Sequence, residues 1–336
     1  MTTDKGSGLS GEDRLIARHF QPIARHPGAL GLHDDAAFFT PPPGFDLVLT
    51  KDMLVGGVHF FNDDPADAVA RKALRVNLSD LAAKGADPAG FLLALGLPSD
   101  ADEAWLEAFA AGLAADAEQY GCPLFGGDTV RSPGAAIVSV TAFGTLPSGA
   151  MVHRAGASAG DRVLVTGTIG DAALGLVMRS DALRADKWQL APAEREYLAR
   201  RYLLPEPRTA FAAAVRAHAS AAMDVSDGLA GDFAKLCRES GVSADIEADR
   251  VPLSPAARKA VAADADALRV ALTGGDDYEI VLTAAPAKVA ALTAAAAAAG
   301  IALAEIGRVT AGAGTPRFLD SAGRPLDLGQ GSFSHF

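Results

Sequence analysis

Along the 336 residues, short apolar runs alternate with longer amphipathic stretches. In the first half, the short runs are rich in Val, Leu and Phe, as in FDLVLT and AAIVSVTAFGTL, and are typical of buried strands. The longer stretches begin near Pro65 and end near Gly85, or repeat apolar residues with a helical period. The predicted strands are 45–50, 122–127 and 135–146, and the predicted helices are 65–84 and 101–119.

The second half repeats this mixture after PSGAMVHRAGASAGD (147–161), a stretch rich in small residues that is typical of a domain boundary. We therefore predict two domains, residues 1–148 and 149–336, in an α/β (α+β) fold. RVLVTGTIGDAALGL (162–176) predicts a strand, a glycine-rich loop and the start of a helix. Further predicted helices are 207–218, 228–240 and 286–300, and further predicted strands are 244–248 and 278–284.

Composition excludes several classes of protein. A hydrophobic content of 49% and a charged content of 21% are typical of a folded protein, and the net charge of -11 argues against a nucleic-acid partner. FLLALGLP (91–98) is too short to span a membrane, and the polar start of the chain does not resemble a signal peptide, so we expect a cytoplasmic protein. Cys122 and Cys237 form neither a disulfide framework nor a metal-binding pair.

Candidate chemistry lies in acidic clusters beside glycine or at the predicted ends of elements. We expect TKD to end the first strand, GGDT to end another, and NLSD to lie within a helix with Asn77 and Asp80 on one face. The clusters are HDDAA (33–37), TKD (50–52), NLSD (77–80), GGDT (126–129), DVSD (224–227) and TGGDDYE (273–279).

Each cluster alone has an ordinary structural interpretation as a turn or a helix cap. Asp80 differs, because an aspartate inside a helix has poor propensity and caps nothing. Taken together, carboxylates that converge cannot all stay ionised without cations. Oxygen ligands without a His or Cys pattern favour Mg²⁺, which commonly bridges carboxylates to substrate phosphates. An acidic protein could bind an anionic substrate in this way.

Other candidate residues leave their alternatives open. TGTIGDAALG (166–175) and GGDT offer backbone N–H groups to an anion, but neither matches a P-loop, and a tight turn explains each equally well. Arg154 is interpreted either as a phosphate ligand or as a surface charge. His59 is either a hydrogen-bonded structural histidine or a ligand-binding residue. Lys72, Lys84 and Trp105 are interpreted as structural or surface residues.

These motifs, in this order, resemble the thiamine-monophosphate kinases, a family related to aminoimidazole ribonucleotide synthetase and selenophosphate synthetase. The resemblance covers the chain from about residue 12 to its end. It is carried by DDAAFF, TKDMLVGGVHF, ARKALRVNLSDLAAKGADP, FGGDTVR, TGTIGDAALGL, DVSDGL, GGDDYE and the final HF.

The resemblance implies a fold, a reaction and an assembly. The fold would be the two-domain aminoimidazole ribonucleotide synthetase-like fold, with an N-terminal mixed sheet and helices and a C-terminal α/β sandwich. The reaction would be phosphorylation of thiamine monophosphate to thiamine diphosphate by ATP, with several Mg²⁺ ions and in-line transfer. The assembly would be a homodimer in which N-terminal sheets pack together, with ATP and substrate between the two domain types.

The resemblance also assigns residues by position. Asp52, Asp80 and Asp128 would be catalytic; Gly127, Asp128, Arg154 and Ser226 would contact the nucleotide; His59, Asp276, Phe333 and Gln330 would face the thiamine compound. The metal ligands would be Asp34, Asp35, Thr50, Lys51, Asp52, Asp80, Asp128, Asp224 and Asp227.

The chain departs from the family pattern at four places, three of which are among these residues. His33 stands where the family usually has Gly, and Lys51 stands where it has Ser or Thr, which leaves only a backbone carbonyl for metal at that position. Asp276 replaces the usual Glu. Gln330 aligns with a frequent Trp, so Phe333 becomes the aromatic candidate for stacking on the substrate.

Two alternatives remain open. One is another ATP-dependent enzyme of the same superfamily, such as a purine cyclo-ligase; Cys122 and Cys237 occupy neither the N-terminal nor the C-terminal position of the reactive cysteines in its other members. The second is a non-catalytic protein that binds Mg²⁺ and nucleotide. ADP release on addition of thiamine monophosphate distinguishes the kinase from the binding protein, and formation of thiamine diphosphate distinguishes it from the sister enzyme.

Overall fold

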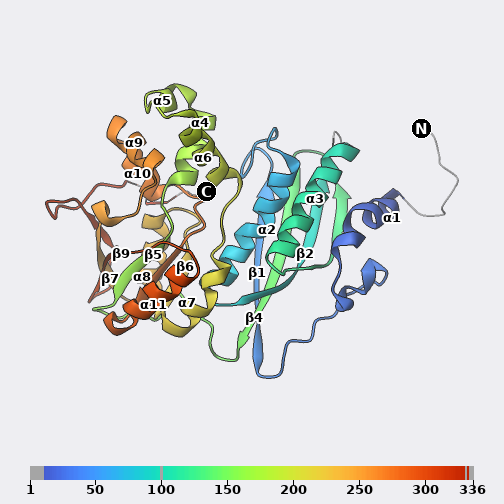
Figure 1. Ribbon diagram of the computed structural model, residues 1–336, viewed down its shortest axis with the longest axis horizontal. Coiled ribbons are helices and arrows are strands. Elements are labelled where there is room, and N and C mark those ends of the chain that lie inside the picture. Colours follow the sequence, from blue (N-terminus) through green and yellow to red (C-terminus); the bar gives the residue numbers. More distant parts are fainter. Residues whose placement is uncertain (1–10, 99–100, 330, 333–336) are drawn as a thin grey trace. The chain divides into compact units, whose positions relative to one another are not determined.

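The computed structural model describes residues 11–98, 101–329 and 331–332, and the chain divides into two units (Figure 1). The first unit comprises Met1–Asn77 and Pro88–Thr145, and the second comprises Leu78–Asp87 and Leu146–Phe336. The division falls inside helix α2 (Ala66–Ala83), so the end of that helix belongs to the second unit. Both units combine a sheet with helices, as the sequence predicts.

The first unit is built on a four-stranded sheet in the order β1-β4-β2-β3, in which β2 and β3 are parallel. Helices α2 and α3 lie across the sheet in Figure 1. The N-terminal part adds short turns of π and 3₁₀ helix at 16–20, 21–23 and 27–32. The elements are α1 (Gly11–Leu15), β1 (Phe45–Val55), α2 (Ala66–Ala83), β2 (Asp87–Leu97), α3 (Glu103–Gln119), β3 (Leu124–Arg131) and β4 (Ile137–Pro147).

Strand β1 is longer than the sequence pattern predicts. The prediction that TKD (50–52) ends this strand is wrong, because the apolar residues Met53–Val55 continue it. Burial alternates along the strand: Val48 and Leu54 are buried, whereas Leu49, Lys51 and Met53 are exposed. Since successive side chains of a strand point to opposite faces, Lys51 lies on the open face of the sheet and its two neighbours on the other.

Strand β3 likewise contains GGDT rather than ending at it, so that prediction is also wrong. The strand runs in parallel with β2 and pairs Gly127 with Leu93. A Cβ atom on Gly127 would lie 1.8 Å from the Leu93 carbonyl oxygen, so only glycine permits this approach. A polar stretch can therefore stay in a strand, because glycine allows close pairing and every second residue faces outward.

The second unit contains a six-stranded mixed sheet in the order β10-β7-β9-β5-β8-β6. The pairs β5–β8, β5–β9, β6–β8 and β7–β9 are antiparallel, and β10–β7 is parallel. The strands are β5 (Arg162–Thr166), β6 (Ala221–Asp224), β7 (Ser243–Glu247), β8 (Ile280–Ala284), β9 (Leu303–Thr310) and β10 (Arg317–Leu319). The helices are α4 (Asp171–Ser180), α5 (Ala182–Asp186), α6 (Pro192–Leu203), α7 (Ala212–His218), α8 (Leu229–Ser240), α9 (Pro255–Ala263), α10 (Ala267–Thr273) and α11 (Pro286–Ala298), with 3₁₀ turns at 209–211 and 248–250.

Helices pack on this sheet through separate apolar clusters. One cluster joins Phe233 of α8 to Val165 of β5 and Val281 of β8. Another joins Val215 of α7 to Leu292 of α11. These buried side chains hold the ends of β5, β6 and β8 in fixed positions, and the loops that leave those ends carry the candidate residues of this unit.

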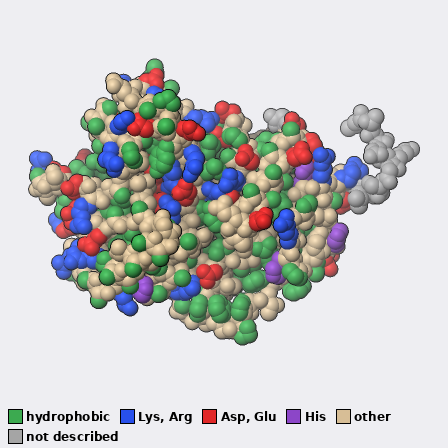
Figure 2. All heavy atoms as spheres, in the orientation of Figure 1, with side chains coloured by type: hydrophobic (Ala, Val, Ile, Leu, Met, Phe, Trp, Pro, Cys, Tyr) green, Lys and Arg blue, Asp and Glu red, His purple; other side chains and the backbone are tan. Residues whose placement is uncertain are grey.

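Two surface properties bear on possible partners. On the face shown in Figure 2, Lys and Arg side chains are interspersed with Asp and Glu. In the part of the chain that the structure describes, no helix combines the length and the apolar character needed to cross a bilayer.

A buried ion cluster joins α2 to α3 in the first unit. Asp116 is fully buried and accepts hydrogen bonds from Arg75 Nε at 2.5 Å, from Arg75 Nη2 at 3.0 Å and from Arg71 Nε at 3.0 Å. Arg75 is itself buried, so loss of the carboxylate would remove a counter-ion and two hydrogen bonds from a buried guanidinium.

We expect Asp116→Ala to lower the free energy of unfolding by about 3–5 kcal/mol, because a buried guanidinium loses its counter-ion. The measurement is chemical denaturation followed by circular dichroism. Glu118→Ala is the matched control: it lies on the same helix, its side chain is 78% exposed, and the change should stay within about 0.5 kcal/mol. Equal midpoints for the two variants would contradict the role of the cluster.

Candidate active site

The first unit contains a cavity of about 700 Å³ that gathers several of the predicted site residues. It is lined by Asp34, Asp35, Lys51, Gly127 and Asp128, together with apolar residues of β2 and of the N-terminal segment. The two aspartates before β1 are exposed, and Asp35 N donates a hydrogen bond to Asp34 Oδ1 at 2.8 Å. The structure therefore brings the HDDAA, TKD and GGDT motifs to one cavity.

The pleat of β1 separates the three residues of TKD. Lys51 lines the cavity, and its Nζ donates a hydrogen bond of 2.7 Å to Ser139 Oγ on β4. Thr50 and Asp52 are half-buried on the other side of the strand. The backbone links the two sides, because Ser139 Oγ donates to the Asp52 carbonyl oxygen at 3.2 Å.

His59 has a structural role in the turn that follows β1. Its Nδ1 accepts a hydrogen bond of 3.0 Å from Val55 N, which assigns the proton of a neutral ring to Nε2. Lys72 is buried and donates from Nζ to the His59 carbonyl oxygen at 3.1 Å. The interpretation of His59 as a hydrogen-bonded histidine is confirmed.

Asp80, Asp224 and Arg154 belong to the second unit and share an electrostatic neighbour, Lys84. Asp80 lies on α2 and Asp224 ends β6. Lys84 Nζ donates a hydrogen bond of 2.7 Å to the Ala222 carbonyl oxygen. The pKa of Lys84 is lowered to about 8, mainly by burial of the ammonium group and further by the nearby charge of Arg154. The carboxylates of Asp224 and Asp80 act in the opposite direction and raise it.

The sequence analysis missed Lys84 as a member of this group. The available signal was its position four residues after Asp80, which places it one helical turn further along, just past the end of α2. A lysine held among these charges supplies a fixed positive charge beside Asp224.

The DVSD motif forms the loop between β6 and α8. Ser226 N and Asp227 N donate hydrogen bonds of 2.9 and 2.8 Å to Asp232 Oδ2, so this buried carboxylate holds the loop. Burial raises the pKa of Asp232, and Lys235 opposes the shift by contacting Asp232 Oδ1 at 2.8 Å. Lys235 also contacts Asp227 Oδ2 at 2.6 Å. The sequence analysis missed both Asp232 and Lys235.

The GGDDYE loop lies directly against the DVSD loop. Asp276 N donates to the Ser226 carbonyl oxygen at 2.9 Å, and Tyr278 N donates to the Val225 carbonyl oxygen at 2.8 Å. Asp276 and Tyr278 have left-handed backbones, with φ of 72° and 51°. The structure thus brings Ser226, Asp227 and Asp276 together, as the motif analysis expects of converging loops.

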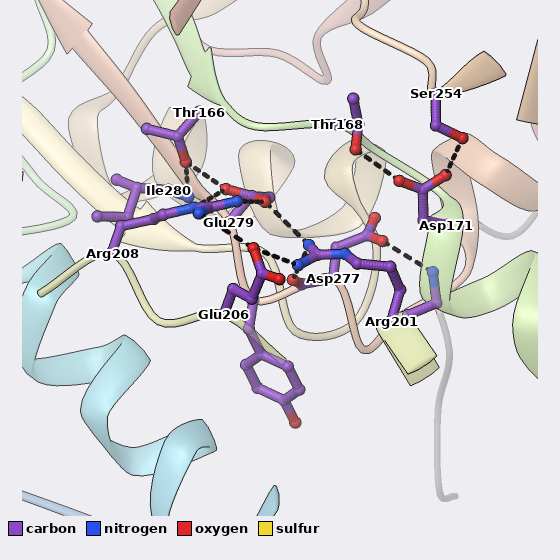
Figure 3. A network of polar contacts seen from close by, with 12 residues as sticks. Thr166, Thr168, Asp171, Arg201, Glu206, Arg208, Ser254, Asp277, Glu279 and Ile280 are labelled. Carbon is purple, nitrogen blue, oxygen red and sulfur yellow. Dashed lines mark hydrogen bonds and ion pairs between the residues drawn. The ribbon is translucent and has the colours of Figure 1, made fainter. Parts of the chain in front are cut away.

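A buried polar network fixes these loops from beneath (Figure 3). Glu279 is fully buried and accepts hydrogen bonds from Thr166 Oγ1 at 2.7 Å, Arg201 Nη2 at 2.9 Å and Arg208 Nε at 2.7 Å. Burial alone would lower the pKa of Arg201, but the Glu279 and Glu206 carboxylates raise it. Two arginines and one carboxylate therefore form a charged cluster that is paired inside the unit.

The same network extends to the glycine-rich loop after β5. Asp277 Oδ2 accepts a hydrogen bond of 2.6 Å from Gly170 N at the start of α4, and burial raises the Asp277 pKa well above its usual value. Gly167 packs against the Glu279 carboxylate, where a Cβ atom would lie 2.0 Å from Oε1. The structural roles in this network belong to Asp277, Glu279 and Gly167. Within the GGDDYE motif, Asp276 is the residue that remains a candidate for contact with a ligand.

The oxygen donors of both units fit magnesium in kind. Within the described residues, no group of three or more His, Cys, Asp or Glu side chains forms a complete metal site. Mg²⁺ requires less than that from a protein, since one or two carboxylates suffice when phosphates and water complete the coordination. Asp34, Asp35 and Asp128 around one cavity provide such donors. Gln330 and Phe333 lie outside the described residues.

Comparison with known proteins gives a consistent set of matches. The protein-family model described as "AIR synthase related protein, N-terminal domain" matches residues 33–146, and the family model of the corresponding C-terminal domain matches residues 158–318. The thiamine-monophosphate kinase of Caulobacter vibrioides is 46% identical over 308 residues, which cover 90% of this chain and 85% of that protein.

Solved structures agree with this match. The crystal structure of thiamine-monophosphate kinase from Stenotrophomonas maltophilia K279a has a TM-score of 0.81 and 41% identity, and covers 94% of this chain and 96% of that one. The structure of AaThiL complexed with AMPPCP and TMP has a TM-score of 0.75 and 32% identity, and covers 90% of this chain and 91% of that one.

We expect Glu279→Gln to destabilise the second unit by about 3–5 kcal/mol, because Arg201 and Arg208 lose their shared counter-ion. The measurement is the denaturant midpoint of unfolding. Glu239→Gln is the control, since Glu239 pairs with Arg238 at the surface and its loss should cost less than about 1 kcal/mol. A Glu279→Gln protein with the midpoint of the unmodified chain would disprove the proposed importance of the network.

Proposed function

This chain belongs to the thiamine-monophosphate kinase family, and we propose that it transfers the terminal phosphoryl group of ATP to thiamine monophosphate, giving thiamine diphosphate and ADP. The observation that carries the proposal is the gathering of Asp34, Asp35 and Asp128 around one cavity, in a chain whose relative AaThiL was solved with AMPPCP and TMP. The family models match residues of both units.

We assign the residues of this reaction in three groups. Asp52, Asp80 and Asp128 are the catalytic metal ligands, and Asp34, Asp35, Thr50, the Lys51 carbonyl, Asp224 and Asp227 complete the magnesium sites. Gly127, Asp128, Arg154 and Ser226 bind the nucleotide. His59 and Asp276 face the thiamine compound, as would Gln330 and Phe333. Bound magnesium ions would reduce the repulsion between the two anionic phosphates and polarise the transferred group.

The chain's own residues then mainly orient the reactants. The acceptor is a phosphate oxygen that is already ionised near neutral pH, so no side chain has to remove a proton from it. Orientation is provided by rigid supports: Asp232 holds the backbone of Ser226 and Asp227, and Glu279 anchors the loop that carries Asp276. A fixed geometry for in-line attack supplies much of the rate enhancement in such transfers.

Both cysteines are unsuited to nucleophilic chemistry. Cys122 and Cys237 are buried, and burial raises the pKa of each thiol to about 12. A thiol that stays protonated at neutral pH is a poor nucleophile. This supports direct transfer between phosphates over a cysteine-dependent reaction of the superfamily. A cytoplasmic location remains part of the proposal.

We also propose that the enzyme is a homodimer formed through the open face of the first unit's sheet. Leu49 and Met53 of β1, Leu92 of β2 and Val130 of β3 are exposed, and Leu49 is 64% accessible. Apolar side chains exposed on three strands of one sheet are costly to leave in water, and the same face of a second copy would cover them in an isologous contact.

The first test is an assay with ATP, Mg²⁺ and thiamine monophosphate, in which ADP is measured enzymatically and thiamine diphosphate by chromatography. We expect both products in equal amounts and none after chelation of the metal. ADP without thiamine diphosphate would point to a sister enzyme of the superfamily. Nucleotide binding without turnover would point to a binding protein.

Asp52→Asn and Asp80→Asn should each lower turnover by orders of magnitude, because each loses a charged magnesium ligand while the shape of the side chain is kept. Turnover at saturating substrate, together with a melting curve that shows the fold intact, is the measurement. Asp249→Asn, at an exposed position on a 3₁₀ turn, is the matched control. Retained activity and unchanged metal dependence in both variants would contradict the assignment.

Leu49→Asp should convert the dimer into monomers, because a carboxylate would be buried in an apolar contact. Light scattering after size-exclusion chromatography gives the mass. Leu183→Asp, at an 82% exposed position on α5, should leave the mass unchanged. A monomeric unmodified protein would refute the dimer without affecting the reaction.

A further inference from the structure

Lys235 of α8 places an ammonium group between two carboxylates at the DVSD loop of the second unit. Its Nζ donates hydrogen bonds of 2.6 Å to Asp227 Oδ2 and 2.8 Å to Asp232 Oδ1. Lys235 follows Asp232 by three positions, so both side chains lie on one face of α8. The Asp227 side chain is 39% exposed, whereas that of Asp232 is fully buried. The lysine therefore joins a carboxylate that solvent reaches to one that it does not.

The two carboxylates have different capacities for a further ligand. Both oxygens of Asp232 are used inside the unit, since Oδ2 accepts from Ser226 N and Asp227 N and Oδ1 accepts from Lys235. Asp227 Oδ1 accepts no hydrogen bond from the part of the chain that the structure describes, and only Oδ2 is used, by Lys235. A ligand can thus reach Asp227, but the charge of this carboxylate is already partly compensated by an ammonium group.

This arrangement has an electrostatic consequence for cations at Asp227. A divalent ion that binds this carboxylate either displaces the ammonium group of Lys235 or lies close to it, and repulsion between the two cations weakens its binding. The buried Asp232 keeps the ammonium group in place, because it binds Nζ from the other side. An anionic phosphate chain supplies the negative charge that offsets this repulsion. Binding of a divalent ion at Asp227 is therefore more favourable with a phosphate ligand than without one.

We propose that Lys235 is an internal counter-ion of Asp227, which opposes binding of Mg²⁺ at this carboxylate until a phosphate-bearing ligand is present. The inference rests on the proposed function, in which Asp227 is a magnesium ligand, and it adds a positioning residue that acts through Asp227. Its consequence is that Mg²⁺ reaches the DVSD loop together with the nucleotide and not before it. A lysine that only oriented the carboxylate would have the opposite effect, because partners that orient a metal ligand strengthen metal binding.

The test measures binding of Mn²⁺, a paramagnetic substitute for Mg²⁺, to the full chain without nucleotide, from the electron paramagnetic resonance signal of the free ion. Lys235→Met keeps most of the side-chain volume and removes the charge, and we expect one Mn²⁺ to bind roughly tenfold more tightly. With saturating AMPPCP the gain should fall below about threefold, because the phosphates already offset the repulsion. Lys259→Met is the matched control: Lys259 also pairs with a carboxylate, Glu194 at 2.7 Å, and its loss should leave Mn²⁺ binding unchanged.

A double-mutant cycle assigns the effect to one carboxylate. In a chain that carries Asp227→Asn, the further change Lys235→Met should no longer tighten Mn²⁺ binding, because the ion then has no charged ligand beside the lysine. A gain that persists in this chain would overturn the inference.

Mn²⁺ binding by Lys235→Met that is equal to or weaker than that of the unmodified protein would also overturn it, and so would a gain of the same size with AMPPCP bound. Melting curves identify a variant that fails to fold, and Lys235→Gln then replaces Lys235→Met. The result is separate from the proposed function, since no turnover is measured: if the unmodified protein forms no thiamine diphosphate, the reaction is wrong, and the Mn²⁺ affinities still decide the role of Lys235.

Discussion

The buried carboxylate of Glu279 is the group on which the loop geometry of the second unit depends. It accepts hydrogen bonds from two arginines of the segment around α6 and one from Thr166, so it ties β5 and α6 to the start of β8. Such a charged group is stable in the interior only while every partner is present. The DVSD loop rests on this support, because Val225 N donates to the Glu279 carbonyl oxygen at 2.8 Å.

The first unit positions its candidate residues by a different constraint, the pleat of its sheet. Successive side chains of β1 point alternately to the face that lines the cavity and to the opposite face. Gly127 permits β3 to approach β2 closely. The TKD and GGDT motifs thus lie on strands whose spacing is set by backbone hydrogen bonds. The DVSD and GGDDYE motifs form loops whose shape is set by buried charges. Both arrangements restrict the motion of the candidate residues, and direct transfer depends on a fixed geometry.

The sequence predicted those parts of the site that local chemistry determines. Asp80 lies within a helix, because Pro65 and Gly85 mark the two ends of a long amphipathic stretch. DVSD precedes a helix, as the glycine that follows it, Gly228, indicates. TKD and GGDT were misassigned to strand ends, because polar residues usually end strands and only the sheet context shows that they continue. Glu279 was missed because its partners Arg201 and Arg208 lie 78 and 71 residues away. Such a contact leaves no local pattern.

The division of the chain into units has a consequence for how the protein is made. Residues 78–87, from the first half of the chain, belong to the second unit, where Lys84 contacts Ala222 and Arg216 Nη1 donates to the Gly85 carbonyl oxygen. A fragment that begins after residue 148 lacks this segment and cannot complete its own interior. During synthesis the segment emerges long before its partners, so the second unit acquires its full set of contacts only when both halves of the chain have left the ribosome. The second unit therefore depends on a segment that is encoded within the first half of the chain.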